Sequence, residues 1–289
     1  MLAIRLLGSP QVLSAGQPLS LTRRKSRAVL YYLAAYPQPV ARSQLLALLW
    51  PDHSAATARH NLRTTIYHLR QMLGDDLQLD SEWLALAEGV DVDTRALVAW
   101  LHRPNPDDAA LAAALARYQG DFLTGFDLPD AQEFEDWITV ERERYRRLAI
   151  NGFATLSRRR EQAGDFPAAL AALQQALAID PFQEDLQRAA LRLHYLAGDR
   201  AGAIRRYEEL VRLLDEEMGV PPMAETRSLY DAIITDTLPR PEPAAQPPAQ
   251  PPAAESPAAA PALPAAAPAY APATVEPVTP FVGRAAELQ

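Results

Sequence analysis

A three-residue motif that returns after 34 residues constrains the fold of this chain more than any other feature. Ala163-Gly164-Asp165 recurs identically as Ala197-Gly198-Asp199, and apolar or small residues follow both copies at matching positions. A period of 34 residues is typical of a helix–turn–helix repeat, in which glycine gives the turn its backbone freedom. Two such repeats bury too little apolar surface by themselves. We therefore expect them to stack against long flanking helices, which the sequence indicates at about 131–160 and 224–236.

A second segment, Thr57 to Leu73, predicts an amphipathic helix with two opposed faces. Its apolar stripe consists of Ala58, Leu62, Ile66, Leu69 and Leu73. Its other side presents His60, Arg63, Thr64, Tyr67 and Gln71, with Arg59 and Arg70 on a flank. Such a helix suits the major groove of DNA, where arginine reads guanine and the other polar side chains reach bases or phosphates. An ordinary surface helix has the same pattern, so the surrounding sequence must decide between the two.

Charge is divided unevenly along the 289 residues. Residues 1–73 hold nine arginine or lysine residues and one acidic residue, Asp52, which gives this segment a charge of +8. The net charge of the whole chain is −8, so the remainder carries −16. A basic N-terminal module attached to an acidic body is what attraction to nucleic-acid phosphates requires.

The N-terminal module predicts short strands, three helices and a final hairpin. Strands are expected at Leu2 to Leu7 and Gln11 to Leu13, and a turn at Ala15 to Pro18 then leads to Leu19 to Leu21. Helices are expected at Thr22 to Tyr36, Ser43 to Leu49 and Thr57 to Leu73, with a loop at Asp52 to Ala56. Thr22 and Ser43 are the expected N-caps. Leu77 to Leu79 and Trp83 to Leu86 predict a hairpin around the turn from Asp80 to Glu82. This order of elements is that of a winged helix.

Four segments of this module are distinctive: RRKSRA (23–28), PVARSQLL (39–46), LLWP (48–51) and ARHNLR (58–63). With them, residues 1–93 resemble the OmpR/PhoB-type winged helix of SARP-type bacterial transcriptional activators. The resemblance implies that the third helix enters the major groove of double-stranded DNA. It makes Arg59, His60, Arg63, Thr64 and Tyr67 the base-facing candidates and Arg70 a phosphate contact. The acidic tip from Asp80 to Glu82 disfavours contact of the wing with the minor groove.

Basic side chains also gather where the first long helix begins, at Arg23, Arg24, Lys25 and Arg27. Positive charges and the free backbone N–H groups of a helix N-terminus can both meet a DNA phosphate. The alternative is a basic helix end that is simply solvated.

Residues 94–238 predict a helical body. The 34-residue period is that of tetratricopeptide (TPR) repeats. Five further segments resemble the bacterial transcriptional activation domain (BTAD), which follows the winged helix in SARP-type regulators: YQGDFL (118–123), Trp137 with ERER (141–144), IDP (179–181), EMGVPP (217–222) and ETR (225–227). The resemblance implies that this domain supports formation of a homodimer or contact with partner proteins, including RNA polymerase.

Residues 239–280 contain fourteen prolines and fifteen alanines, a composition that predicts a disordered, partly polyproline-like linker. The last nine residues, 281–289, resemble the start of the nucleotide-binding domain of STAND-type or AAA-like ATPase regulators. No P-loop motif follows, and Lys25 is the only lysine. We therefore expect the chain to be part of a longer regulator or an early-terminated relative of one.

Several other functions are disfavoured. The chain has no cysteine, and the spacings of His53, His60 and His68 suit no common zinc site, so neither a metal nor another cofactor is expected. The carboxylates of 133–143 read as solvated helix faces rather than as a catalytic pair. No apolar run approaches the roughly 20 residues that span a bilayer, and we expect a cytoplasmic protein without a membrane partner.

The sequence thus predicts a mainly α protein: an α+β winged helix-turn-helix domain, an all-α TPR-like domain and a disordered tail rich in proline and alanine. The predicted function is that of a sequence-specific DNA-binding transcriptional regulator, most simply an activator, and not of an enzyme. The alternative is a TPR interaction scaffold of a signalling ATPase that does not bind DNA.

Overall fold

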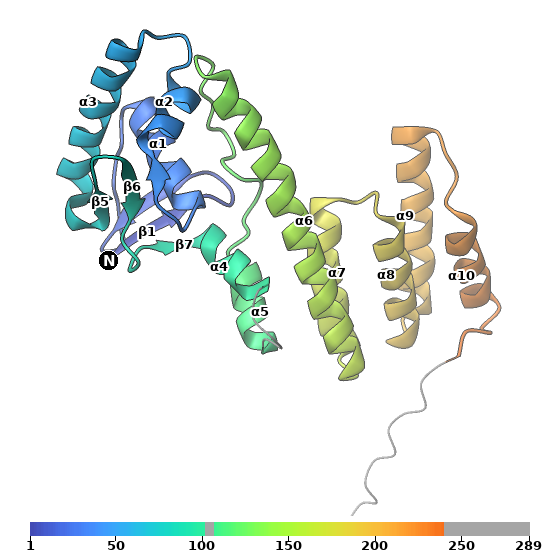
Figure 1. The fold of residues 1–289 in the computed structure, drawn as a ribbon. Coiled ribbons are helices and arrows are strands. Elements are labelled where there is room, and N and C mark those ends of the chain that lie inside the picture. Colours follow the sequence, from blue (N-terminus) through green and yellow to red (C-terminus); the bar gives the residue numbers. More distant parts are fainter. Residues whose placement is uncertain (102–106, 240–289) are drawn as a thin grey trace, which may run out of the picture. The chain divides into compact units, whose positions relative to one another are not determined.

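The computed structural model describes residues 1–101 and 107–239 (Figure 1). Nearly all of the predicted linker 239–280 and the predicted start of an ATPase domain at 281–289 lie outside these described residues. In the described part of the chain, no helix has the length and apolar character needed to cross a membrane.

A four-stranded sheet opens the chain. It consists of β1 (Leu2–Arg5), β2 (Gln11–Ser14), β3 (Gln17–Pro18) and β7 (Asp91–Val92), in the spatial order β3-β2-β1-β7. The first three strands are antiparallel, and β7 returns from the end of the module to pair in parallel with β1, with Ile4 opposite Val92. The turn predicted at Ala15 to Pro18 is shorter in the structure, because Gln17 and Pro18 already form the third strand.

Three helices and a second sheet complete the predicted winged helix. The helices are α1 (Arg24–Ala35), α2 (Arg42–Leu49) and α3 (Ala55–Leu73). The second sheet has the order β4-β6-β5 and consists of β4 (Val40–Ala41), β5 (Leu77–Leu79) and β6 (Trp83–Leu86). β5 and β6 form the predicted hairpin, and a single 3-10 turn, η1 (Gly74–Asp76), joins it to α3.

The predicted N-caps of the first two helices are wrong. Arg23 and Ala41 occupy these positions, and neither makes a side-chain capping hydrogen bond. The third helix begins two residues earlier than predicted, because the Ser54 hydroxyl accepts the amide of Thr57 at 3.3 Å and so caps it. Serine and threonine therefore indicated correctly where each helix lies, but they did not identify its first residue.

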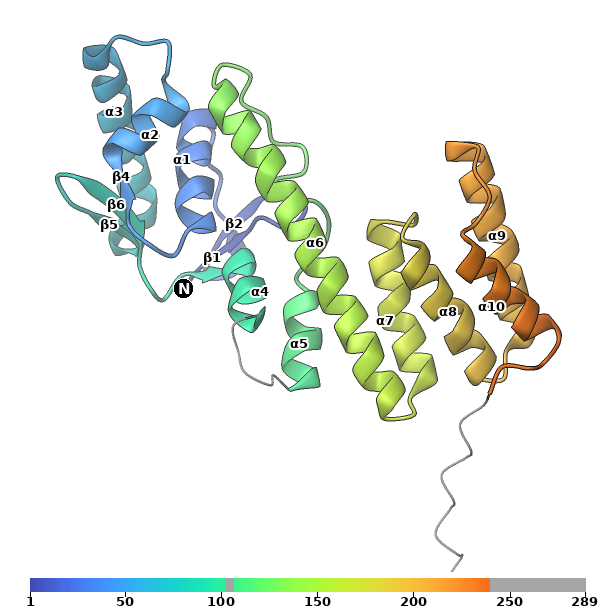
Figure 2. The ribbon, with the colours of Figure 1, turned by 45° about the vertical axis from the view of Figure 1, so that its right-hand side comes forward.

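Seven helices form the helical body in the part of the chain that the structure describes (Figures 1 and 2). They are α4 (Asp93–Leu101), α5 (Asp108–Leu115), α6 (Gln132–Gln162), α7 (Phe166–Ile179), α8 (Glu184–Leu196), α9 (Arg200–Met218) and α10 (Ala224–Ile234). Consecutive helices from α6 to α10 pack on one another. The two flanking helices predicted at about 131–160 and 224–236 are confirmed as α6 and α10.

The repeated motif makes the same turn twice. Gly164 and Gly198 have φ values of +78° and +82°, in the left-handed region that glycine tolerates. The following aspartates cap the next helices: Asp165 accepts the amide of Ala168 at 3.0 Å, and Asp199 accepts that of Gly202 at 2.8 Å. The predicted helix–turn–helix repeat is thus confirmed down to its hydrogen bonds.

The winged helix and the helical body share one hydrophobic core, which extends from β1 to α8. A smaller cluster of Leu191, Tyr195, Ala203 and Ile233 lies between α8, α9 and α10. The C-terminal end of α1 is held by α4, because the Arg95 guanidinium donates to the carbonyls of Leu33, Ala34 and Tyr36 at 2.6–3.0 Å. Those carbonyls belong to the last turn of α1, where a helix lacks acceptor partners of its own.

Candidate nucleic-acid interface

Helix α3 buries its predicted apolar stripe and exposes its predicted polar face. All five stripe residues are buried, with Leu69 fully so. Arg59, His60, Arg63 and Tyr67 are exposed, and Thr64 is half-buried. Figures 1 and 2 show α3 on the side of the winged helix that faces away from α6. The helix therefore presents a continuous row of arginine and hydrogen-bonding side chains to the solvent.

One side chain of that face is an exposed aromatic ring. Tyr67 is 59% exposed, and its hydroxyl accepts a hydrogen bond of 2.7 Å from the Gln71 amide. This bond between residues four apart directs the tyrosine hydroxyl toward Gln71, on the next turn of α3. A fixed ring costs less conformational entropy when it meets a ligand.

Arg70 is placed differently from the other predicted contacts. Its guanidinium donates to the Leu77 carbonyl at 2.8 Å and to the Asp75 carboxylate at 3.2 Å. It therefore fastens the end of α3 to the first strand of the wing. Its predicted role as a phosphate contact remains a prediction, and its replacement would also loosen the hairpin.

A surface groove of about 470 Å³ joins α3 to the start of α1. Arg23, Arg24, Lys25 and Ser26 line it from α1, His60, Asn61, Thr64 and Thr65 from α3, and Trp50, His53 and Asp130 complete it. The structure thus brings two predicted base-facing residues beside three of the predicted phosphate contacts. Sequence reasoning had placed these groups on separate helices without a shared site.

Two of the four basic side chains at the start of α1 form ion pairs with the helical body. Lys25 Nζ lies 3.0 Å from Asp130 Oδ2, and Arg24 Nη1 lies 3.4 Å from Asp127 Oδ2. Lys25 also donates to the Leu49 carbonyl at 2.6 Å and is only 19% exposed. Sequence reasoning missed these pairs, because the partners lie more than 100 residues apart in the chain.

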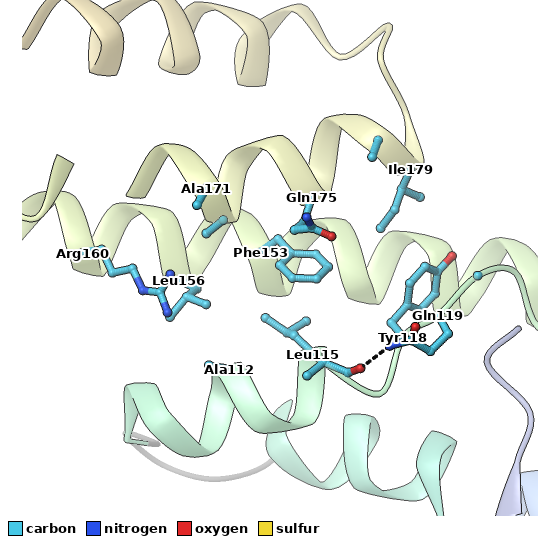
Figure 3. Close-up of a pocket in the computed structure, with 14 residues that line it drawn as sticks. Ala112, Leu115, Tyr118, Gln119, Phe153, Leu156, Arg160, Ala171, Gln175 and Ile179 are labelled. Carbon is cyan, nitrogen blue, oxygen red and sulfur yellow. Dashed lines mark hydrogen bonds between the residues drawn. The ribbon is translucent and has the colours of Figure 1, made fainter. Parts of the chain in front are cut away.

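A second cavity lies in the helical body between α5, α6 and α7 (Figure 3). It measures about 620 Å³, and Leu115, Phe153, Leu156 and Ile179 form most of its apolar wall. Arg160 is the only charged residue among the described residues that line it, and its guanidinium donates to the Ala168 carbonyl at 3.1 Å. This cavity lacks the paired carboxylates or the histidine that acid–base chemistry would use.

These features define a class of protein in which a winged helix with an exposed, basic third helix precedes TPR-like helical repeats. Two family models match the same two parts of the chain. Residues 16–90 match the C-terminal domain of transcriptional regulatory proteins, and residues 93–234 match the bacterial transcriptional activator domain. The chain thus has the two domains of SARP-type transcriptional regulators, in the same order.

Two transcriptional regulatory proteins of mycobacteria are similar to the chain over most of its length. The chain is 26% identical over 246 residues to the transcriptional regulatory protein MoaR1 of Mycobacterium tuberculosis, which covers 79% of this chain and 78% of that protein. It is 24% identical over 247 residues to the regulator EmbR of the same organism, of which it spans 62%.

A solved structure has the same fold. The structure of Mycobacterium tuberculosis EmbR in complex with a low-affinity phosphopeptide matches with a TM-score of 0.61 and 24% identity. The match covers 83% of this chain and 66% of that one.

Proposed function

We propose that this regulator binds double-stranded DNA in a sequence-specific manner, with α3 in the major groove, and activates transcription. The observation that carries the proposal is the exposed row of Arg59, His60, Arg63 and Tyr67 on a helix whose opposite side is buried in a basic module. The major groove of DNA is wide enough to admit an α-helix and presents a distinct hydrogen-bonding pattern for each base pair.

Within this proposal, the exposed arginines Arg59 and Arg63 read guanine through two hydrogen bonds each. His60, Thr64 and Tyr67 contact bases or adjacent phosphates. Arg23, Arg24, Lys25 and Arg27 attract phosphates at the start of α1, and Arg70 does so at the far end of α3. Attraction to phosphates gives affinity and register, whereas contacts to base edges give specificity.

The helical body carries the proposed protein contacts. In the SARP-type arrangement it supports a homodimer or contact with RNA polymerase, and its acidic surface does not itself attract DNA. No catalytic step is part of the proposal. The second candidate function, a scaffold without DNA binding, is favoured by the engagement of Arg24 and Lys25 with carboxylates, which lowers the free positive charge of the module.

Binding of the full chain to the gene's own upstream region tests the proposal. Fluorescence anisotropy at several salt concentrations should show a complex that an unrelated duplex does not compete away. Arg63→Ala should weaken specific binding by roughly 10- to 100-fold, since a bidentate arginine–guanine contact contributes about 1–3 kcal/mol of discrimination.

Arg212→Ala provides the matched control, because it removes one positive charge from an exposed position on α9. Indifference of the parent chain to DNA at physiological salt would favour the scaffold instead. Equal binding by the parent and Arg63→Ala would contradict the assignment of α3 as the recognition helix.

A further inference from the structure

One short stretch of the helical body covers most of the basic cluster at the start of α1. This stretch, Gly125 to Asp130, precedes α6 and is called the acidic segment below. Three of its residues each contact one basic side chain: Asp127 contacts Arg24, Asp130 contacts Lys25, and Phe126 contacts Arg27. Of the four predicted phosphate contacts, only Arg23 has no ion pair or ring contact recorded among the described residues.

The closest of these contacts is between Lys25 and Asp130. The carboxylate oxygen lies 3.0 Å from Nζ, and Nζ also donates to the Leu49 carbonyl at the end of α2. The lysine lies over the Trp50 ring, 5.7 Å from its centroid. A phosphate that approaches this ammonium competes with the Asp130 carboxylate, because the contacts with Leu49 and Trp50 hold Lys25 where it is.

The segment combines buried anchors with accessible carboxylates. Phe126 is buried and meets Tyr31 edge to face at 5.1 Å, while the Arg27 guanidinium lies 5.1 Å from the centre of its ring. Leu128 is buried as well, and its amide donates to the Glu135 carboxylate. In contrast, the side chains of Asp127 and Asp130 are 58% and 65% exposed. The carboxylates can therefore be displaced by a competing anion while the apolar anchors stay in place.

The groove also holds donors that lack an acceptor. Helix α1 begins without a side-chain cap, so its first N–H groups receive no side-chain acceptor. Ser26 is 3% exposed and lines the groove, and its hydroxyl has no hydrogen-bond partner among the described residues. A DNA backbone phosphodiester carries one negative charge, as the Asp130 carboxylate does, and its oxygens can accept from the Ser26 hydroxyl and from the first N–H groups of α1 as well as from Lys25.

We propose that the acidic segment is an interdomain latch whose carboxylates occupy the positions of DNA backbone phosphates, so that DNA and the helical body compete for the start of α1. The inference rests on the proposed function and adds regulation to the same site. Any partner of the helical body that draws the acidic segment away strengthens DNA binding without touching α3. Conversely, bound DNA loosens the contact between the two domains, since coupling between two ligands is reciprocal.

Removal of the two carboxylates tests the latch. Asp127→Asn with Asp130→Asn keeps the shape of both side chains and removes their charge. In the full chain this double variant should bind DNA about 3- to 10-fold more tightly at low salt. The gain should be equal on the upstream region and on an unrelated duplex, because backbone phosphates carry no sequence information.

The matched control is Glu216→Gln with Glu217→Gln, which removes two exposed charges at the end of α9. This control corrects for the change in net charge alone. Thermal unfolding confirms that each variant is folded. Suppose that the parent binds DNA and that Arg63→Ala weakens this binding. If the double asparagine variant then binds no better than the control, the latch is wrong and the proposed function stands. If neither the parent nor the asparagine variant binds DNA, both proposals fail. If the asparagine variant alone binds, the latch is supported as fully closed in the parent.

Hydrogen exchange of the parent provides a second readout. The amides of Phe126 and Ala131 donate within the loop, to Leu123 at 3.1 Å and to Leu128 at 2.9 Å. Saturating duplex should accelerate exchange in residues 125–131 and slow it in α3. Slower exchange in α3 with unchanged exchange in 125–131 would overturn the latch while supporting contact of α3 with DNA.

Discussion

The indole Nε1 of Trp137 donates a hydrogen bond of 2.9 Å to the hydroxyl of Tyr36. The bond joins α6 to the residue that ends α1, across 101 positions of sequence. Tyr32 packs its ring against the same indole, 4.7 Å between centroids. The two domains are therefore connected through an aromatic cluster that also has a directional polar contact.

Trp137→Phe removes the donor and part of the ring area, and we expect a loss of about 1–3 kcal/mol in the free energy of unfolding. Tyr36→Phe removes the acceptor, together with the long bond of 3.5 Å that the hydroxyl donates to Glu141, and should cost about 1 kcal/mol. A double-mutant cycle by urea unfolding measures the coupling between them. A coupling energy indistinguishable from zero would show that the bond contributes nothing to the domain contact.

Ionisation of Asp91 should make the free energy of unfolding depend on pH in the acidic range. Partial burial opposes its ionisation, but hydrogen bonds from Arg117 and Arg5, both 2.6 Å long, hold its pKa below the ordinary value of 3.8. Because the pKa of Asp91 is lower in the folded state than in the unfolded state, its ionised carboxylate stabilises the fold. This stabilisation is complete above the ordinary pKa and is lost as the pH falls through the pKa of the folded state.

Urea unfolding from pH 6 to pH 2 checks this prediction. The parent should lose more stability below about pH 4 than Asp91→Asn does, since the variant has no carboxylate to protonate. At neutral pH the variant should be less stable by about 1–3 kcal/mol, the range for hydrogen bonds to charged groups. Parallel pH profiles of the two proteins would show that Asp91 does not cause the loss of stability in acid.

Substitution of Gly198 and Gly202, which lie within one turn of each other, should lower the free energy of unfolding by different amounts. A Cβ at Gly198 would meet nothing within 4 Å, so Gly198→Ala should cost only the strain of a left-handed backbone, about 1–2 kcal/mol. At Gly202 a Cβ would lie 1.9 Å from the Asp199 carboxylate that caps α9. Gly202→Ala should therefore cost more, because the cap must move. Thermal unfolding of both variants compares them, and Gly164→Ala provides the equivalent change in the first repeat. A smaller loss for Gly202→Ala than for Gly198→Ala would contradict this account.

Periodicity predicted the helices of this chain well, because burial of one face is a strong and repeated signal. The stripe of α3 and the turns at Gly164 and Gly198 are the clearest cases. Strands of two residues, such as Val40–Ala41 and Asp91–Val92, are too short to show an alternating pattern, and sequence reasoning missed both. The first residues of helices were also displaced, since Ser54 and Thr57 are both good caps and lie within one turn of each other.

The site was predictable only where its residues lie on one helix. The spacing in α3 identifies its exposed face without knowledge of any partner. The state of Lys25 could not be predicted in this way, because its charge is met by Asp130, which comes from another domain. A cluster of basic residues in a sequence indicates attraction to anions, but it does not say which anion is present.

Helix α1 is held by the helical body at both of its ends. The acidic segment contacts its first turn, and Arg95 together with Trp137 holds its last. A rigid rod that is clamped twice cannot tilt independently of the clamp. Any rotation of the helical body must therefore turn α1, and with it the helix surface against which α3 packs. The structure in this way connects movement of the helical body to the orientation of the winged helix.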